Sequence, residues 1–193
     1  MWPLESIAKP LLERVRDATS ETVQLAVLDG FRVLYVAKID GTHMLRLESS
    51  VGLRLPPHAT GGGKTLLAGL SDSSLTTWLE NATLERYTPS TITSRTALLQ
   101  EIAGVRRAGY AVDREEILIG ATCVAVGVRN HPGATVAAMS VAGATVRLRK
   151  REQEFALRQL RAAAAELSAA LGYSGTPTAS QDFGIASIQH PST

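Results

Sequence analysis

Two strand-like apolar runs separated by Asp29 and Gly30 constrain the fold of this chain more than any other feature. The runs cover residues 23–28 and 31–39. Asp-Gly accepts the positive φ angles of a tight turn, so the two runs are predicted to pair as a β-hairpin. A third short strand is expected at residues 44–48. Because a hairpin pairs its strands antiparallel, the chain is expected to build an antiparallel sheet.

A second hairpin and five helices complete the expected elements. Strand-like residues 121–128 and 135–141 flank a His-Pro-Gly turn. Ser71 is a typical helix N-cap, Gly109 is a typical helix stop, and Pro10 predicts a kink or a later start in the first helix. The expected helices cover residues 4–18, 60–70, 72–79, 96–108 and 146–171. This order predicts an α+β fold, with helices packed beside the sheet.

The composition is that of an ordinary globular domain. Of 193 residues, 45% are hydrophobic and 20% are charged, and the net charge is +2. Lys and Arg are spread along the chain, which excludes the dense basic stripe of a self-sufficient nucleic-acid binder. The one cysteine, Cys123, excludes an internal disulfide and fits a reducing cytosol. No secretory signal or membrane-spanning apolar run is recognisable, so a cytoplasmic protein is expected.

The glycines of residues 61–63 are the first candidate binding element. Together with Lys64 and Thr65 they end like a phosphate loop, but that loop needs a glycine where this chain has His58. A helix that begins in glycines offers unpaired N–H groups at its positive end, and a carboxylate could sit on them. Alternatively, the glycines allow tight packing of a helix on the sheet. Both interpretations stay open from the residues alone.

Other residues of chemical interest give weaker signals. Asp113, Glu115 and Glu116 lie close together, but no histidine stands at a metal-ligand spacing and no calcium-type loop is formed. A group of acids like this one usually forms a solvated turn. Asp113 differs because it follows an apolar strand-like segment. Cys123 is better explained as a small buried hydrophobe than as a nucleophile, and Ser140 lacks the glycines of a nucleophile elbow. No catalytic residue, metal site or cofactor is therefore predicted.

In their order and spacing, six segments resemble the effector-binding domain of IclR-type bacterial transcription regulators. The segments are residues 21–28, 55–64, 88–93, 106–116, 120–125 and 137–143. The resemblance extends over about residues 4–171. It implies a curved antiparallel sheet with flanking helices, related to the sensory GAF fold. It also implies a pocket for small organic or aromatic acids, and assembly into homodimers or homotetramers.

The resemblance also implies which residues line that pocket. Its polar groups would be the N–H groups of Gly61 and Gly62, the Asp113 carboxylate, Cys123 and Ser140. Its apolar wall would include Met44, Leu47, Leu55 and Ala121. Two residues depart from the pattern of the family. Ala142 stands where the family often has a serine, and Ala121 stands where it often has a larger apolar residue. Together they imply a ligand bulkier or less polar than a two- or three-carbon keto acid.

The resemblance further implies how the chain is organised. Family members carry a winged helix-turn-helix domain before this region, and no segment here is expected to be that domain. The chain is expected to bind ligand, and to reach DNA only through the domain it lacks. Residues 1–173 are expected to form the effector-binding domain. Residues 174–193 form a tail rich in Ser, Thr, Pro and Gly, which Phe183, Ile185 and Ile188 could anchor on this or a neighbouring subunit.

Three functions are compatible with these observations. The first is a ligand-sensing and oligomerisation domain of a transcription regulator. The second is a small enzyme acting on an acyl or keto-acid substrate, with Cys123 as nucleophile and His58 or Asp113 assisting. The third is a structural dimerisation module with a vestigial pocket. A histidine within reach of Cys123 would favour the enzyme, and an interior without a cavity would favour the structural module.

Overall fold

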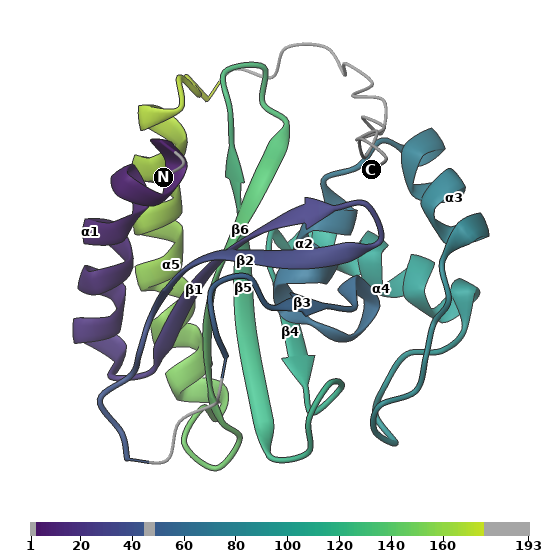
Figure 1. Cartoon of the computed structure of the whole chain (residues 1–193), viewed down its shortest axis with the longest axis horizontal. Coiled ribbons are helices and arrows are strands. Elements are labelled where there is room, and N and C mark those ends of the chain that lie inside the picture. Colours follow the sequence, from purple (N-terminus) through teal and green to yellow (C-terminus); the bar gives the residue numbers. More distant parts are fainter. Residues whose placement is uncertain (1–2, 45–48, 176–193) are drawn as a thin grey trace, which may run out of the picture.

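The computed structural model describes residues 3–44 and 49–175, which form a six-stranded sheet with helices on both faces (Figure 1). The strands are β1 (Thr22–Asp29), β2 (Arg32–Ile39), β3 (Arg54–Leu55), β4 (Ala111–Arg114), β5 (Ala121–Arg129) and β6 (Thr135–Ala144). The helices are α1 (Pro3–Thr19), α2 (Gly61–Ala68), α3 (Asp72–Asn81), α4 (Arg95–Ala108), α5 (Lys150–Ala170) and the short 3-10 helix η1 (Pro57–Ala59). The strand order is β3-β2-β1-β6-β5-β4, and every neighbouring pair is antiparallel. The predicted α+β fold is confirmed.

Both predicted hairpins are present. β1 and β2 pair up to Asp29 opposite Arg32, and Gly30 adopts a φ of 58°, which is the conformation the turn requires. β5 and β6 form the second hairpin, and β6 also pairs with β1. The two hairpins therefore join edge to edge through β1 and β6, and the strands at the centre of the sheet come from distant parts of the chain.

Successive side chains of a strand point to opposite faces of the sheet, so the two faces carry different residues. Val124, Val126 and Val128 of β5 belong to a core formed with α1 and α5, which lie side by side on the left of Figure 1. The opposite face of the sheet carries α2, with α3 and α4 packed beyond it. On that face, β5 and β6 carry small or polar side chains, including Cys123 of β5 and Ser140 of β6. The cavity described below lies on this second face.

Capping residues define α2, α3 and α4. The Thr60 hydroxyl accepts a hydrogen bond from the Gly63 N–H at 3.2 Å, and the Ser71 hydroxyl accepts one from the Ser74 N–H at 3.2 Å. Gly109 ends α4 in the left-handed conformation, with a φ of 74°. The predicted N-cap at Ser71 and the predicted stop at Gly109 are confirmed.

Two elements differ from the sequence-based expectations, and the first helix shows that Pro10 does not delay its start. The last helix begins at Lys150 rather than at residue 146, because the N–H groups of Arg147 and Leu148 both donate to the Ala144 carbonyl in a turn. The first helix contains Pro10 without a later start. The strand that pairs with β2 is β3, at residues 54–55, whereas most of the expected strand at residues 44–48 lies outside the described residues.

Close packing explains one of the three glycines of α2. A Cβ atom on Gly63 would lie 2.3 Å from Pro57 Cα and 2.6 Å from Thr60 Oγ1. A Cβ atom on Gly62 would have no neighbour nearer than Ala138 Cβ, at 3.9 Å. Gly63 therefore allows α2 to pack directly on η1, which differs from the packing on the sheet that the sequence suggested.

We expect Gly63→Ala to destabilise the fold by about 1–3 kcal/mol, because the added methyl group meets backbone atoms that cannot move aside cheaply. Gly62→Ala is the matched control, and it should be neutral or stabilising by up to about 1 kcal/mol, because alanine favours a helix. Urea unfolding followed by circular dichroism measures both changes. Equal stability of the two variants would contradict this explanation.

Candidate functional site

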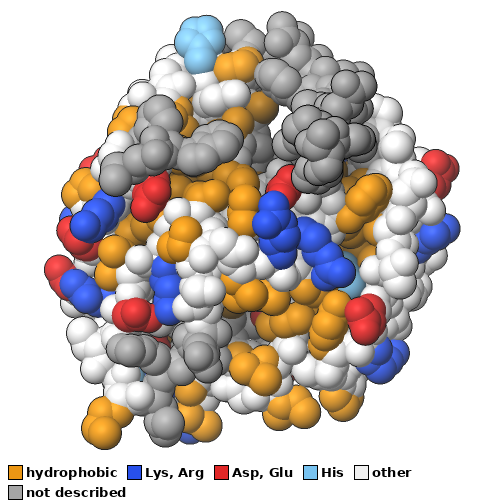
Figure 2. All heavy atoms as spheres, in the orientation of Figure 1, with side chains coloured by type: hydrophobic (Ala, Val, Ile, Leu, Met, Phe, Trp, Pro, Cys, Tyr) orange, Lys and Arg blue, Asp and Glu red, His pale blue; other side chains and the backbone are white. Residues whose placement is uncertain are grey.

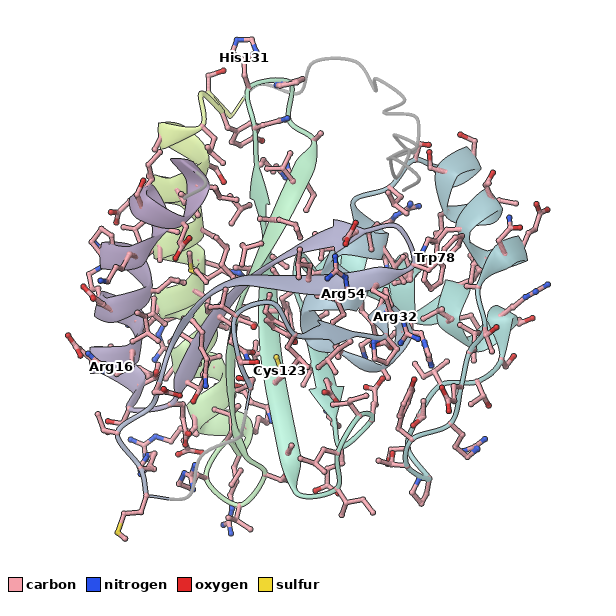
Figure 3. All side chains as sticks on the ribbon, in the orientation of Figure 1. Arg16, Arg32, Arg54, Trp78, Cys123 and His131 are labelled. Atoms are coloured by element: carbon pink, nitrogen blue, oxygen red, sulfur yellow. The ribbon has the colours of Figure 1, made fainter. Side chains whose placement is uncertain are left out.

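A cavity of about 320 Å³ opens on the face of the sheet that carries α2; we call it the sheet cavity. It is bordered by the strands β1 to β6, by Thr60 before α2, and by the loop after β4. Its lining residues are Gln24, Tyr35, Ser49, Leu53, Leu55, Thr60, Asp113, Ile117, Leu118, Ala121, Thr122, Cys123 and Ala142. Figure 3 shows Cys123 near the centre of the molecule, on β5. The size and the mixed lining are those of a small-molecule site.

Antiparallel register brings the predicted polar residues together. Asp113 of β4 stands opposite Cys123 of β5, and Cys123 stands opposite Ala142 of β6. Four predicted pocket residues line the cavity, namely Leu55, Asp113, Ala121 and Cys123. Neighbouring strands thus assemble one wall from residues that lie far apart in sequence.

The other predicted residues lie behind this wall or outside it. Gly62 and Ser140 contact the Cys123 thiol, and a Cβ atom on Gly61 would lie 3.2 Å from Cys123 Sγ. Met44 does not line the cavity, because its side chain is fully exposed at a bend. Leu47 lies outside the described residues.

The Cys123 thiol is unreactive as a nucleophile at neutral pH. Burial, together with the nearby Asp113, raises its pKa to about 12, while hydrogen bonds from Ser140 and the Gly62 N–H act in the opposite direction. The thiol is therefore neutral at pH 7, whereas a nucleophilic cysteine needs a thiolate. No histidine hydrogen-bonds Cys123 among the described residues, since His58 instead donates through Nε2 to the Glu85 carbonyl at 2.9 Å. This arrangement suits a binding wall rather than catalysis.

Asp113 is poised between two protonation states. It is 2% exposed, and burial raises its pKa to about 7. The Glu116 N–H donates to Asp113 Oδ1 at 2.7 Å and opposes that rise, whereas the negative charge of Glu116 adds to it. Near neutral pH, Asp113 can accept a hydrogen bond from a ligand hydroxyl or, when protonated, donate one to a ligand carboxylate.

Sequence reasoning missed the group that holds Asp113 in place. Lys64 is completely buried, and its ammonium donates three hydrogen bonds. The acceptors are Glu101 Oε1 at 2.8 Å, Glu116 Oε1 at 2.7 Å and the Val112 carbonyl at 2.7 Å. These bonds use all three protons of the ammonium and tie α2 to α4, to β4 and to the loop after β4. The only sequence signal was a lysine at a helix start combined with a separate group of acids.

Two further residues of the cavity wall belong to no recognisable sequence motif. Tyr35 is 6% exposed, and burial, with the nearby Cys123 and Asp113, raises the pKa of its phenol, which therefore stays a hydrogen-bond donor. Gln24 donates to Ser49 Oγ at 2.7 Å. Both are polar residues within otherwise apolar strands, and that contrast is the signal that could have identified them.

A larger hollow of about 680 Å³ lies elsewhere, between the end of α1 and the start of α5. Its buried acid, Glu21, already accepts two hydrogen bonds from the Arg147 guanidinium, at 2.7 and 3.0 Å. The sheet cavity is the better site candidate despite its smaller volume, because it gathers Asp113, Tyr35 and Cys123. Among the described residues, no group of three or more His, Cys, Asp or Glu side chains could hold a metal ion.

Comparison with known proteins places the chain among transcription regulators. The family model for the bacterial transcriptional regulator IclR C-terminal region matches residues 2–169. The chain is 40% identical over 166 residues to the HTH-type transcriptional regulator XynR of Escherichia coli K12, covering 86% of this chain and 66% of that protein. It is 32% identical over 172 residues to the HTH-type transcriptional repressor AllR of the same strain, covering 89% and 64%. The chain thus spans about two thirds of the length of these relatives.

Solved structures show the same fold. The IclR protein of Thermotoga maritima superposes with a TM-score of 0.86 at 34% identity, covering 89% of this chain and 70% of that one. The C-terminal domain of the Escherichia coli regulator KdgR gives 0.81 at 33% identity, covering 88% and 99%. The inducer-binding domain of PobR from Acinetobacter, a double mutant in complex with 3-hydroxybenzoic acid, gives 0.79 at 33% identity, covering 85% and 97%.

The Lys64 network makes a stability prediction. Lys64→Met removes the ammonium and leaves the buried Glu116 without its counter-ion, which should cost about 3–5 kcal/mol of unfolding free energy. Lys150→Met, at an exposed lysine, is the matched control and should change stability by less than about 0.5 kcal/mol. Urea unfolding at pH 7.5 measures both. A Lys64→Met variant as stable as the control would show that the network is dispensable.

Asp113 makes a prediction about pH. A carboxyl whose pKa is higher in the folded than in the unfolded state stabilises the fold when protonated. That contribution is lost as the pH rises from the ordinary value of 3.8 through about 7. Asp113→Asn keeps the acceptor for the Glu116 N–H but does not titrate. We therefore expect the variant to gain stability relative to wild type between pH 5 and pH 8.

Unfolding free energies at four pH values across that range test the prediction. Glu154→Gln, at an exposed carboxyl on α5, is the control and should follow the wild-type pH dependence. Parallel curves for wild type and Asp113→Asn would mean that Asp113 is not perturbed by burial.

Proposed function

The chain belongs to the IclR C-terminal family of bacterial transcriptional regulators, and we therefore propose that it binds a small organic acid as the effector of such a regulator. The observation that carries the proposal is the sheet cavity. It combines a buried carboxyl, a neutral thiol and a phenol with apolar walls of Leu53 and Leu55. Regulation of transcription, assembly into dimers or tetramers, and a cytoplasmic location are part of this proposal.

The ligand carboxylate would sit at the start of α2. There the Gly63 N–H is bound to Thr60, and the Gly62 N–H faces the Cys123 sulfur. Among the described residues, the Gly61 N–H has no hydrogen-bond partner; because Gly61 lies behind Cys123 and does not line the cavity, a carboxylate reaches this N–H only when the Cys123 side chain moves aside. The anion-binding interpretation of the glycines therefore rests on the N–H group of Gly61. The neighbouring Gly62 N–H makes only a weak hydrogen bond, to the Cys123 sulfur.

The ligand is bulkier than a two- or three-carbon keto acid. Ala121 and Ala142 both line the cavity, and their short side chains leave its volume at about 320 Å³. Asp113 lies on the strand beyond Cys123 and favours a ligand with a hydroxyl group away from its carboxylate. A related inducer-binding domain was solved with 3-hydroxybenzoic acid, which has both groups on one ring. A hydroxylated acid of about this size is the proposed effector class.

Binding would act by a population shift. A ligand can change an equilibrium between quaternary arrangements only through different affinities for them. The cavity is bordered by strands of both hairpins and by the start of α2. A ligand that contacts all of these elements therefore favours one placement of the hairpins and α2 relative to one another. We propose residues 1–173 as the sensing unit; residues 176–193, and with them the proposed tail anchors, lie outside the described part of the chain.

The enzyme alternative is not supported. The matched relatives are transcription regulators rather than enzymes, and the raised pKa of Cys123 removes the proposed nucleophile. The open sheet cavity likewise favours a sensing role over a purely structural module. None of the helices in the described part of the chain has the length and apolar character needed to cross a membrane.

We expect Ala121→Leu to abolish effector binding by filling the sheet cavity. A thermal-shift screen of organic acids first identifies ligands that stabilise the wild type, since saturation at about 100 Kd adds about 2.7 kcal/mol. The shift should disappear in Ala121→Leu and persist in Ala97→Leu, which makes the same change at an exposed helical position. A ligand whose shift survives undiminished in Ala121→Leu binds elsewhere, and if every stabilising acid behaves in this way the sheet cavity is not the effector site.

Calorimetric titration then tests the ligand class. Hydroxybenzoates and longer hydroxy acids should bind more tightly than glyoxylate or pyruvate. Tightest binding for either of those keto acids would contradict the inference drawn from Ala121 and Ala142.

A further inference from the structure

A second cavity, of about 250 Å³, lies at the tip of the β1–β2 hairpin; we call it the hairpin cavity. Phe31 and Arg32 border it on the hairpin, Pro57 and His58 on η1, and Trp78 on α3, with Tyr87 completing the rim. None of these residues lines the sheet cavity. From the geometry of these residues we propose that the hairpin cavity is a separate binding site for a small aromatic monocarboxylate.

Aromatic side chains supply the body of the site. The rings of Phe31 and Trp78 lie 6.1 Å apart at an interplanar angle of 34°. The rings of His58 and Tyr87 lie 6.1 Å apart at 40°. Two ring pairs and the flat face of Pro57 around one hollow favour a planar ligand, because aromatic rings pack best on one another in offset or tilted arrangements.

An exposed arginine at the rim of the cavity indicates a ligand that accepts hydrogen bonds. Arg32 is exposed, and among the described residues it has no carboxylate partner, only the Tyr87 hydroxyl beside it. Trp78 is 3% exposed; its ring borders the cavity, and among the described residues its buried indole N–H has no acceptor. Figure 3 shows Arg32 and Arg54 on the front of the molecule, near Trp78, and Figure 2 shows neighbouring basic side chains in that region.

The surrounding charges limit the ligand to a single negative charge. Glu85 also lines the cavity and accepts a hydrogen bond from the Tyr87 hydroxyl at 2.9 Å, so it repels a phosphate or a dicarboxylate. His58 is buried, and burial lowers its pKa, so the imidazole adds no positive charge at pH 7. Because the Glu85 carboxylate offsets part of the attraction of Arg32, a ligand with one negative charge is repelled less than a ligand with two.

The site is separate from the proposed effector site, although the two share a chain segment. Pro57 and His58 line the hairpin cavity, and Thr60 lines the sheet cavity three residues later. The inference does not depend on the effector proposed above, because it rests on residues that do not contact the sheet cavity.

Tryptophan fluorescence provides a local test. The chain has two tryptophans, so a Trp2→Phe variant leaves Trp78 as the only reporter. Benzoate is the probe, and benzamide is its uncharged analogue. We expect benzoate to change the emission of Trp78 saturably and benzamide to bind at least about tenfold more weakly, since a charge-assisted hydrogen bond is worth about 1.5–3 kcal/mol.

Variants in the Trp2→Phe background identify the site. Arg32→Gln should weaken benzoate binding at least about tenfold. Arg54→Gln, at a nearby arginine that is already paired with Asp29, should leave it within about twofold. Ala121→Leu, which fills the sheet cavity, should also leave it unchanged. Far-UV circular dichroism confirms that each variant is folded.

Three results would overturn the proposal. They are the absence of a saturable emission change, equal affinity in Arg32→Gln and its parent, and loss of the signal in Ala121→Leu. The last would assign benzoate to the sheet cavity. Loss of the acid-induced thermal shift in Ala121→Leu without any effect on the Trp78 signal would support both sites independently.

Discussion

The fully buried Lys64 ammonium is the interaction on which the rest of the structure depends. A buried charge is tolerated only when its hydrogen-bonding capacity is met, and Lys64 finds three acceptors on three different elements. Because the lysine belongs to α2, these bonds set the position of that helix over the sheet. Through Glu116, whose N–H donates to Asp113, the same network orients the carboxyl of the cavity. The positions of α2 and of Asp113 are therefore coupled.

Burial of the polar groups determines which chemistry the sheet cavity can support. It raises the pKa of Cys123 to about 12 and that of Asp113 to about 7, so near pH 7 the thiol is neutral and the carboxyl is divided between its two protonation states. Groups in these states exchange hydrogen bonds with a ligand but do not attack it. This is the chemistry expected of a sensing site, and it agrees with a family of regulators. The hairpin cavity, by contrast, offers the guanidinium of Arg32 to an anion.

Local signals predicted the elements well where backbone conformation alone decides them. Asp29 and Gly30 predicted the first hairpin, Ser71 an N-cap and Gly109 a helix end, and each is present. The start of the last helix was predicted four residues too early, because residues 146–149 have helical character but take part in a turn closed by the Ala144 carbonyl. Of the predicted pocket residues, Asp113 and Cys123 line the cavity, whereas Met44 is exposed in the solvent.

Short-range patterns in the chain are enough to establish the α+β class, both hairpins and the segments that resemble a regulator domain. They do so because turns, caps and apolar periodicity act within a few residues. The pairing of β1 with β6, the burial of Lys64 against acids 37 and 52 residues away, and the raised pKa of Asp113 depend on contacts between distant segments. No local pattern encodes those distances or the loss of water around the groups, so only the folded structure decided which residues form the site.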